Sequence, residues 1–235
     1  MCSVGKRSFA VAALVGVAVL TGCTASVPGK PVAAAAEAAA PPVAASGLDG
    51  LLLDEPEING AMGATGMTVS ESSKQMWDSS TEISEPDCLP VYGAGEYEVY
   101  TGSGWSAMRY ISLQEPEEDP PHFAEQSVVA FPNRDVASNF FADSEKTWAE
   151  CADRRYNLRL PEMNIETLWT VGKIENVNGM LTTSMVMEDG DGWGCERALA
   201  VASNVAVDVT TCSYTRGGGG AETIAGEILK KMPKS

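Results

Sequence analysis

The sequence predicts an α+β fold, in which helices flank an antiparallel sheet that two disulfides stabilise. Segments that alternate between apolar and polar residues lie between segments of helical periodicity at both ends and in the middle of the globular region. Strands interleaved with separate helices are typical of a sheet covered by helices. The even set of cysteines in that region, in a chain that reads as exported, is typical of a disulfide framework. These cysteines are Cys88, Cys151, Cys195 and Cys212.

The first residues indicate export. A short basic region at 1–7 precedes an apolar stretch at 8–20, which is too short to span about 30 Å of hydrocarbon. Leu20-Thr21-Gly22-Cys23 follows directly and matches the bacterial lipobox, whose cysteine is acylated. The pattern predicts a lipoprotein signal peptide at 1–22 and attachment to the outer face of the bacterial cell membrane through acyl chains on Cys23. An ordinary secretory signal and an uncleaved anchor are the alternatives.

The stretch at 23–46 is rich in Ala, Pro and Val and has almost no charge. Such a composition predicts a flexible or partly polyproline tether. A helix in the alanine run is the alternative, although the flanking prolines limit its length. One globular domain is expected at 47–235.

The first half of that domain contains a helix and two strands. Residues 51–63 predict a short helix, with Asp54 or Glu55 as its cap, Pro56 in its first turn and Gly63 at its end. Two alternating segments, 105–114 and 123–131, predict strands, and an acidic, proline-rich loop joins them.

The second half changes period several times. Residues 133–153 repeat apolar side chains on one helical face, with Asn133 as the N-cap. The segments 167–177 and 180–188 predict a hairpin that turns at Asn178-Gly179, and 188–194 predict a further turn. A helix over 221–232 ends the domain.

The pairing of the cysteines follows from one more hairpin. Strand-like runs at 196–202 and 205–211 meet at Ser203-Asn204, and a turn there places Cys195 opposite Cys212. The two residues then form a non-hydrogen-bonded pair with Cα atoms about 4.5 Å apart, within the range of a disulfide. Cys88 and Cys151 remain to pair with each other, and free buried thiols are the alternative.

The same register places Arg197 and Asp208 diagonally on one face of the hairpin. An ion pair or a hydrogen bond between them is expected as a structural contact.

Composition argues against several function classes. A net charge of −16 repels nucleic acid and anionic lipid headgroups. The single histidine, His122, argues against multi-histidine zinc sites and reads as a surface loop residue. Residues 102–106 lack the spacing of a nucleophile elbow. The acidic turn at 189–192 lacks a calcium ligand, since Ala200 stands where a bidentate Glu is needed. No catalytic residue, metal or cofactor is therefore assigned.

Several motifs together resemble one known family. They are Pro86-Asp87-Cys88, Gly102-Ser103-Gly104-Trp105, the segments 125–129 and 148–151, and above all the runs 190–199 (GDGWGCERAL) and 204–212 (NVAVDVTTC). These motifs are similar to the extracellular sensor domain of the mycobacterial PknH-type Ser/Thr kinases over about residues 48–233. The resemblance implies two intramolecular disulfides paired as above, an antiparallel sheet with helices, and a mainly apolar cleft as the ligand site. We expect a stand-alone lipoprotein without a kinase domain.

Two function classes follow. The first is a non-enzymatic ligand-binding or sensor module that takes a small apolar or amphipathic ligand, or an envelope protein, in a cleft. Its candidate residues are Trp105, Tyr110, Trp169 and Met185, because aromatic and Met side chains exceed what a half-exposed sheet face needs. The alternative is that all four fill the core. The second class is an extracytoplasmic hydrolase that uses a pair of carboxylates.

Overall fold

The computed structural model describes residues 41–215 and 218–233. The expected signal peptide, the acylation site at Cys23 and most of the expected tether lie outside the described residues. Contacts of the folded domain begin at the end of that tether, because the backbone N–H of Val43 donates to Asn204 Oδ1 at 2.7 Å. Within the described ranges, no helix combines the length and apolar character needed to cross a bilayer.

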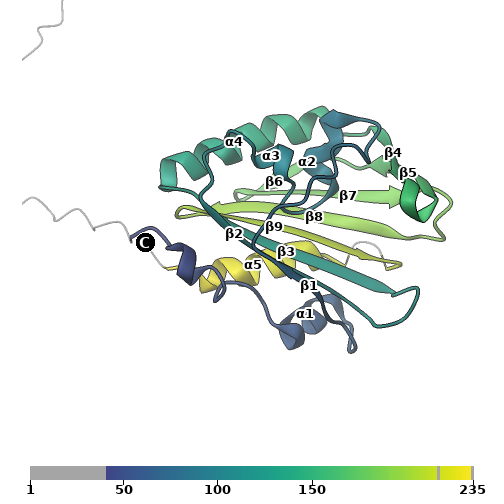
Figure 1. Cartoon of the computed structure of the whole chain (residues 1–235), viewed down its shortest axis with the longest axis horizontal. Coiled ribbons are helices and arrows are strands. Elements are labelled where there is room, and N and C mark those ends of the chain that lie inside the picture. Colours follow the sequence, from purple (N-terminus) through teal and green to yellow (C-terminus); the bar gives the residue numbers. More distant parts are fainter. Residues whose placement is uncertain (1–40, 216–217, 234–235) are drawn as a thin grey trace, which may run out of the picture. The chain divides into compact units, whose positions relative to one another are not determined.

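Nine strands of the described chain form one antiparallel sheet, which confirms the predicted α+β fold (Figure 1). The strand order is β1-β2-β3-β9-β8-β7-β5-β4, and β6 pairs with β7 beside this path. The strands are β1 Thr68–Ser73, β2 Ala107–Gln114, β3 His122–Ala130, β4 Arg155–Leu160, β5 Ile165–Val171, β6 Glu175–Val177, β7 Met180–Met187, β8 Gly194–Ala202 and β9 Val205–Ser213.

Helices cover both faces of the sheet (Figure 1). One face carries α1 and α5, and the other carries α2, α3 and α4. The helices are α1 Glu55–Met62, α2 Leu89–Tyr92, α3 Tyr97–Tyr100, α4 Arg134–Glu150 and α5 Gly220–Lys231, and short 3-10 turns span Ala45–Gly47, Pro86–Cys88 and Pro161–Met163. The central strands are therefore covered on both faces.

Each face of the sheet has its own hydrophobic core. Ile224 and Ile228 of α5 pack against Val207 and Val209 on one side. Trp148 of α4 belongs to the core on the other side, which also contains both disulfides. Strands with both faces buried lose the simple alternation of a half-exposed strand, and the nine residues of β9 are buried except for the last.

The helix ends follow local sequence chemistry. Asp54 caps α1 in a capping box with Glu57, and Gly63 ends the helix in the left-handed conformation with φ 67°. Asn133 caps α4 through a hydrogen bond from the N–H of Val136. Both caps are the predicted ones, with Asp54 rather than Glu55 as the cap of α1.

The predicted hairpin of β8 and β9 and its register are confirmed. Ala202 pairs with Val205 and Cys195 pairs with Cys212, whose Cα atoms lie 4.0 Å apart. The second predicted disulfide, Cys88–Cys151, ties the 3-10 turn before α2 to the end of α4.

The expected hairpin over 167–188 turns at Asn178-Gly179 but is not continuous. Its first arm divides into β5 and β6, and the register against β7 shifts by one residue between Val171–Met185 and Glu175–Thr182. An extra residue in one strand is accommodated as a bulge. The expected strand at 105–114 begins two residues later, at Ala107.

Candidate functional site

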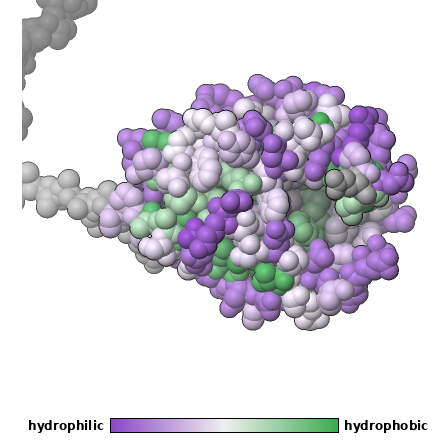
Figure 2. All heavy atoms as spheres, in the orientation of Figure 1, coloured by the Kyte–Doolittle hydropathy of each residue, from purple (hydrophilic) through white to green (hydrophobic). Residues whose placement is uncertain are grey.

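A cleft of about 620 Å³ lies between the sheet and the segment that contains α2 and α3. Every strand of the sheet except β6 contributes to its walls, so residues far apart in the sequence meet there. Figure 2 shows a hollow on this face, with apolar residues in its depth. Seven aromatic side chains line the cleft, and they are Trp77, Tyr92, Tyr110, Phe123, Tyr156, Trp169 and Trp193.

Three of the four residues proposed from the sequence line this cleft. Tyr110 enters from β2, Trp169 from β5 and Met185 from β7, and the Cys195–Cys212 disulfide lies against the same space. Trp105 is not among the lining residues and packs, half-buried, against the adjoining core. All three lining residues are also at least 93% buried and belong to the core, so filling the core and facing the cleft are not exclusive roles.

A row of polar side chains on neighbouring strands begins at the floor of the cleft, which Glu125 and Thr210 line, and continues to Arg197, which does not line the cleft. Glu125 on β3 is paired with Thr210 on β9, and Thr210 is paired with Arg197 on β8. Directly opposed residues in an antiparallel sheet point to the same face, so the three side chains stand side by side. Arg197 Nη1 donates to Thr210 Oγ1 at 2.8 Å.

Glu125 is held by donors from both sides of the cleft. The N–H of Ala94 donates to its Oε1 at 2.7 Å, and the hydroxyl of Tyr110 donates to its Oε2 at 2.8 Å. Burial raises the pKa of this carboxyl, against the opposing effect of the Thr210 side chain and the other donors.

Glu96 lies at the start of α3 and is 3% exposed. Its Oε2 accepts from the N–H of Ser79 at 3.0 Å. Burial raises the pKa of Glu96 to about 7, and the neighbouring charge of Glu125 adds to this effect, while Ser79 and Arg197 act against it.

The predicted contact between Arg197 and Asp208 is a buried ion pair. Arg197 Nη2 lies 2.7 Å from Asp208 Oδ1, and both side chains are almost fully buried. The other oxygen, Oδ2, accepts from the N–H of Gly95 and from the hydroxyl of Tyr100, both at 3.0 Å. The guanidinium also lies 5.4 Å from the ring centre of Trp148. Asp208 thus joins the centre of the sheet to the segment that walls the cleft.

The arrangement contains the carboxylate pair that a hydrolase would need. A Cβ placed on Gly93 would lie 3.2 Å from Glu96 Oε1 and 3.3 Å from Glu125 Oε1, so both oxygens border one small gap. A general acid needs a raised pKa, and both groups have one. Each oxygen of Glu125 already accepts a hydrogen bond from the protein, however, which leaves this carboxylate poorly placed to attack a substrate.

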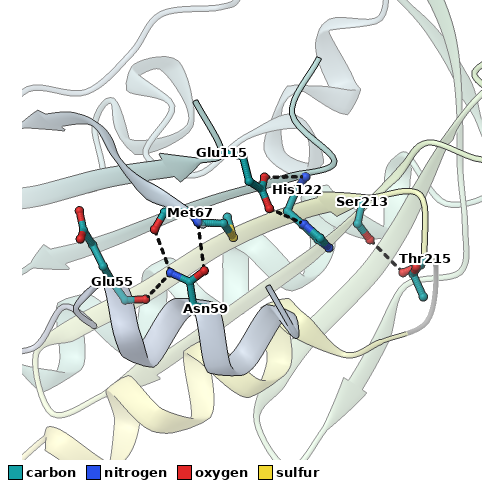
Figure 3. Close-up of polar contacts among 7 residues, drawn as sticks. All are labelled: Glu55, Asn59, Met67, Glu115, His122, Ser213 and Thr215. Atoms are coloured by element: carbon teal, nitrogen blue, oxygen red, sulfur yellow. Dashed lines mark hydrogen bonds and ion pairs between the residues drawn. The ribbon is translucent and has the colours of Figure 1, made fainter. Parts of the chain in front are cut away.

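His122 lies on β3 rather than in a loop, and it is half-buried (Figure 3). Its Nδ1 lies 2.6 Å from Glu115 Oε1, and the other oxygen of Glu115 accepts from the backbone N–H of His122. Ser213 is the cross-strand partner of His122, but its hydroxyl donates to the carbonyl of Thr215 at 2.9 Å. Figure 3 shows the Ser213 hydroxyl directed to Thr215, so the three groups do not form a nucleophilic triad.

A second cavity lies on the same side of the sheet as α4. It has a volume of about 740 Å³ and lies between α2, α3 and α4, and none of the four predicted cleft residues lines it. Among the described residues, no cluster of His, Cys, Asp and Glu side chains is arranged to hold a metal ion.

The sequence reasoning missed Glu96 and Glu125. One signal was present for Glu125, because charged and polar residues at 125–127 interrupt the apolar run of β3, and a buried strand retains such residues only where partners satisfy them. Glu96 stands between short helical turns that have no periodicity, and nothing in the local pattern marks it.

Comparison with known proteins agrees with this fold. The family of PknH-like extracellular domains matches residues 43–232. Over 193 residues, the chain is 33% identical to the serine/threonine-protein kinase PknH of Mycobacterium tuberculosis, covering 82% of this chain and 30% of that protein. It is 32% identical over the same length to PknH of Mycobacterium bovis, covering 82% and 32%. The chain thus spans less than a third of the length of these relatives.

A solved structure extends the likeness to three dimensions. The crystal structure of the extracellular domain of PknH from Mycobacterium tuberculosis matches with a TM-score of 0.77 at 32% identity, covering 81% of this chain and 97% of that one. As the motifs predict, the chain belongs to the family of PknH-like extracellular domains.

Proposed function

We propose that this protein is a non-enzymatic, lipid-anchored sensor module on the outer face of the bacterial cell membrane, and that its cleft takes an apolar or amphipathic envelope ligand. Membership of an extracellular domain family fits an extracytoplasmic location. The lipobox at Leu20-Thr21-Gly22-Cys23 supports the anchor, and the proposed tether would hold the domain away from the membrane surface.

The single observation that supports binding most is the lining of the cleft. Binding sites for small molecules are concave, mostly apolar and of about 300–1,000 Å³, with a few polar groups that orient the ligand. The cleft has a volume of about 620 Å³, seven aromatic rings and a polar floor. Met185 adds a side chain that adapts to irregular ligands.

A hydrolase that uses Glu96 and Glu125 is the second candidate, favoured by their raised pKa values and their common gap. In glycoside hydrolysis one carboxylate must reach the sugar or an attacking water. Both oxygens of Glu125 accept hydrogen bonds from the protein instead. Release of sugar from an aryl glycoside panel, abolished by Glu96→Gln, would favour this candidate over binding alone.

The binding proposal is tested with a fluorescent hydrophobic dye on the disulfide-intact protein. Trp169→Ala and Trp193→Ala remove cleft-lining rings and should weaken dye binding. Trp105→Ala is the matched control, because the same residue type is removed outside the cleft. Trp169 belongs to the core, so its loss can impair folding. Trp193 is only partly buried, so Trp193→Ala tests the cleft without removing a core ring. Equal dye affinity in the wild type and both cleft variants would contradict the proposal.

A further inference from the structure

The charged residues of the cleft have one sign. Four glutamates, Glu71, Glu82, Glu96 and Glu125, line it. No Lys, Arg or His is among the described residues that line it. Carboxylates that converge on a concave, low-dielectric surface create a negative potential there, which attracts cations and repels anions.

Two of these carboxylates are buried without a direct cationic partner. Glu96 and Glu125 are 3% and 9% exposed, and neither forms an ion pair within the described residues. Arg197 attracts both at longer range, but its guanidinium is already paired with Asp208 at 2.7 Å. Burial of a charged carboxylate is costly and raises its pKa, so a bound group that carries positive charge would stabilise the ionised form of both glutamates.

The geometry leaves room for such a group. Oε2 of Glu96 accepts from Ser79, whereas the structure gives its Oε1 no hydrogen bond from the described residues. Gly93 contributes no side chain beside this oxygen, and a Cβ there would approach Glu96 Oε1 at 3.2 Å and Glu125 Oε1 at 3.3 Å. The missing Cβ therefore opens the space between the two carboxylates.

Aromatic rings surround the same space. Trp77 meets Tyr110 edge to face with ring centres 5.7 Å apart, and Tyr156 is stacked with Trp169 at 6.5 Å. Cations, including the ammonium groups of ligands, bind to the faces of Trp and Tyr rings. The cleft therefore suits a ligand that has an ammonium group to contact the carboxylates and an apolar part to pack against the aromatic rings.

We propose that the cleft selects organic cations, and that an ammonium group of the ligand sits beside Gly93 between Glu96 Oε1 and Glu125 Oε1 while its apolar part packs on the aromatic walls. This inference rests on the proposed ligand-binding function and names the chemical class of the ligand. Fatty acids and anionic phospholipid headgroups are disfavoured, because their charge would face four carboxylates without a basic side chain.

The test compares three probes of one chain length: n-octylammonium, n-octanol and octanoate. Isothermal titration of the disulfide-intact protein at pH 8 should show octylammonium binding about tenfold more tightly than octanol, and octanoate binding most weakly. Glu96→Gln should remove most of the octylammonium preference and leave the octanol affinity within about twofold. Glu117→Gln is the control, since Glu117 is an exposed glutamate outside the cleft, and it should change neither affinity.

A second variant leaves all charges in place. Gly93→Ala fills the gap between the two carboxylates and should weaken the binding of octylammonium more than that of octanol. The variant should fold, because alanine readily adopts the backbone angles of φ −141° and ψ 164° at this position. Equal affinity for the three probes, each displacing the hydrophobic dye, would overturn the cation proposal and leave ligand binding intact. Tightest binding of octanoate would also overturn it, and absence of binding by dye and probes alike would overturn both.

Discussion

Asp208 is the acceptor that connects three parts of the molecule, so Asp208→Asn should destabilise the fold far more than an ordinary surface change. Asp208 Oδ1 forms the ion pair with Arg197 Nη2, and Asp208 Oδ2 accepts hydrogen bonds from the N–H of Gly95 and the hydroxyl of Tyr100. All of these are donors. The amide NH₂ of Asn would have to replace one oxygen and would then face a donor.

The size of the expected loss in stability follows from the burial of the Arg197–Asp208 ion pair. Removing one member of a buried ion pair leaves the other charge without compensation and typically costs about 3–5 kcal/mol. The side chains of Arg197 and Asp208 are 1% and 4% exposed, so water cannot restore the lost interaction. Replacing both by apolar residues, as in Arg197→Met with Asp208→Leu, should cost less than the two single losses added together, because no unpaired charge remains.

Urea unfolding of the oxidised protein measures this loss, and hydrogen exchange at the Gly95 amide reports whether the cleft wall loosens with it. Asp143→Asn is the control, since Asp143 pairs with Lys146 in an exposed contact on α4 and should leave the stability nearly unchanged. A loss below about 1 kcal/mol in Asp208→Asn, or single losses that simply add in the double variant, would show that the buried ion pair does not hold the fold in this way.

Three further predictions concern pH, the disulfides and the anchor. Glu96 has a pKa of about 7 in the folded protein against 4.5 for an unperturbed glutamate, so the contribution of its protonated form to folding stability is present at low pH and is lost as pH rises through 7. The side chain of Gln is neutral at every pH. In thermal unfolding, the free energy of unfolding of Glu96→Gln should therefore exceed that of the wild type by about 3 kcal/mol at pH 8 but not at pH 4. Replacing Cys88 and Cys151 together by Ser opens a loop with a sequence separation of 63 and should cost about 4 kcal/mol in urea unfolding. Cys23→Ala should move the protein from the detergent phase to the aqueous phase or block its processing.

Each of these three has a contrary outcome. A stability difference between Glu96→Gln and wild type that is the same at pH 4 and pH 8 would contradict the pH argument. A disulfide-linked peptide joining Cys88 to Cys195 or Cys212 would contradict the pairing, and unchanged detergent partitioning in Cys23→Ala would contradict the lipobox interpretation.

Local sequence chemistry was sufficient wherever neighbours in the chain are also neighbours in space. The two-residue turn at Ser203-Asn204 sets the register of β8 and β9, and that register predicts both the Cys195–Cys212 pairing and the contact of Arg197 with Asp208. Caps and periodicity similarly predict α1 and α4.

The sequence does not predict the helices and strands that form through contacts with residues distant in the chain. The polar, exposed strand β1 forms only because β2 offers a free edge, and β4 forms on β5. The helical turns α2 and α3 have four residues each, too few for a periodic signal, and their position depends on the Cys88–Cys151 disulfide and on Asp208. The cleft lies between these turns and the sheet, so its carboxylates could not be grouped from the sequence.

The proposed function requires that the cleft hold a ligand. Native mass spectrometry of the protein purified from its own host measures this directly. We expect a bound apolar or amphipathic species in the wild type and in Trp105→Ala, and its loss or reduction in Trp169→Ala and Trp193→Ala. A bare protein mass in the wild type, or a species retained equally in all variants, would contradict it.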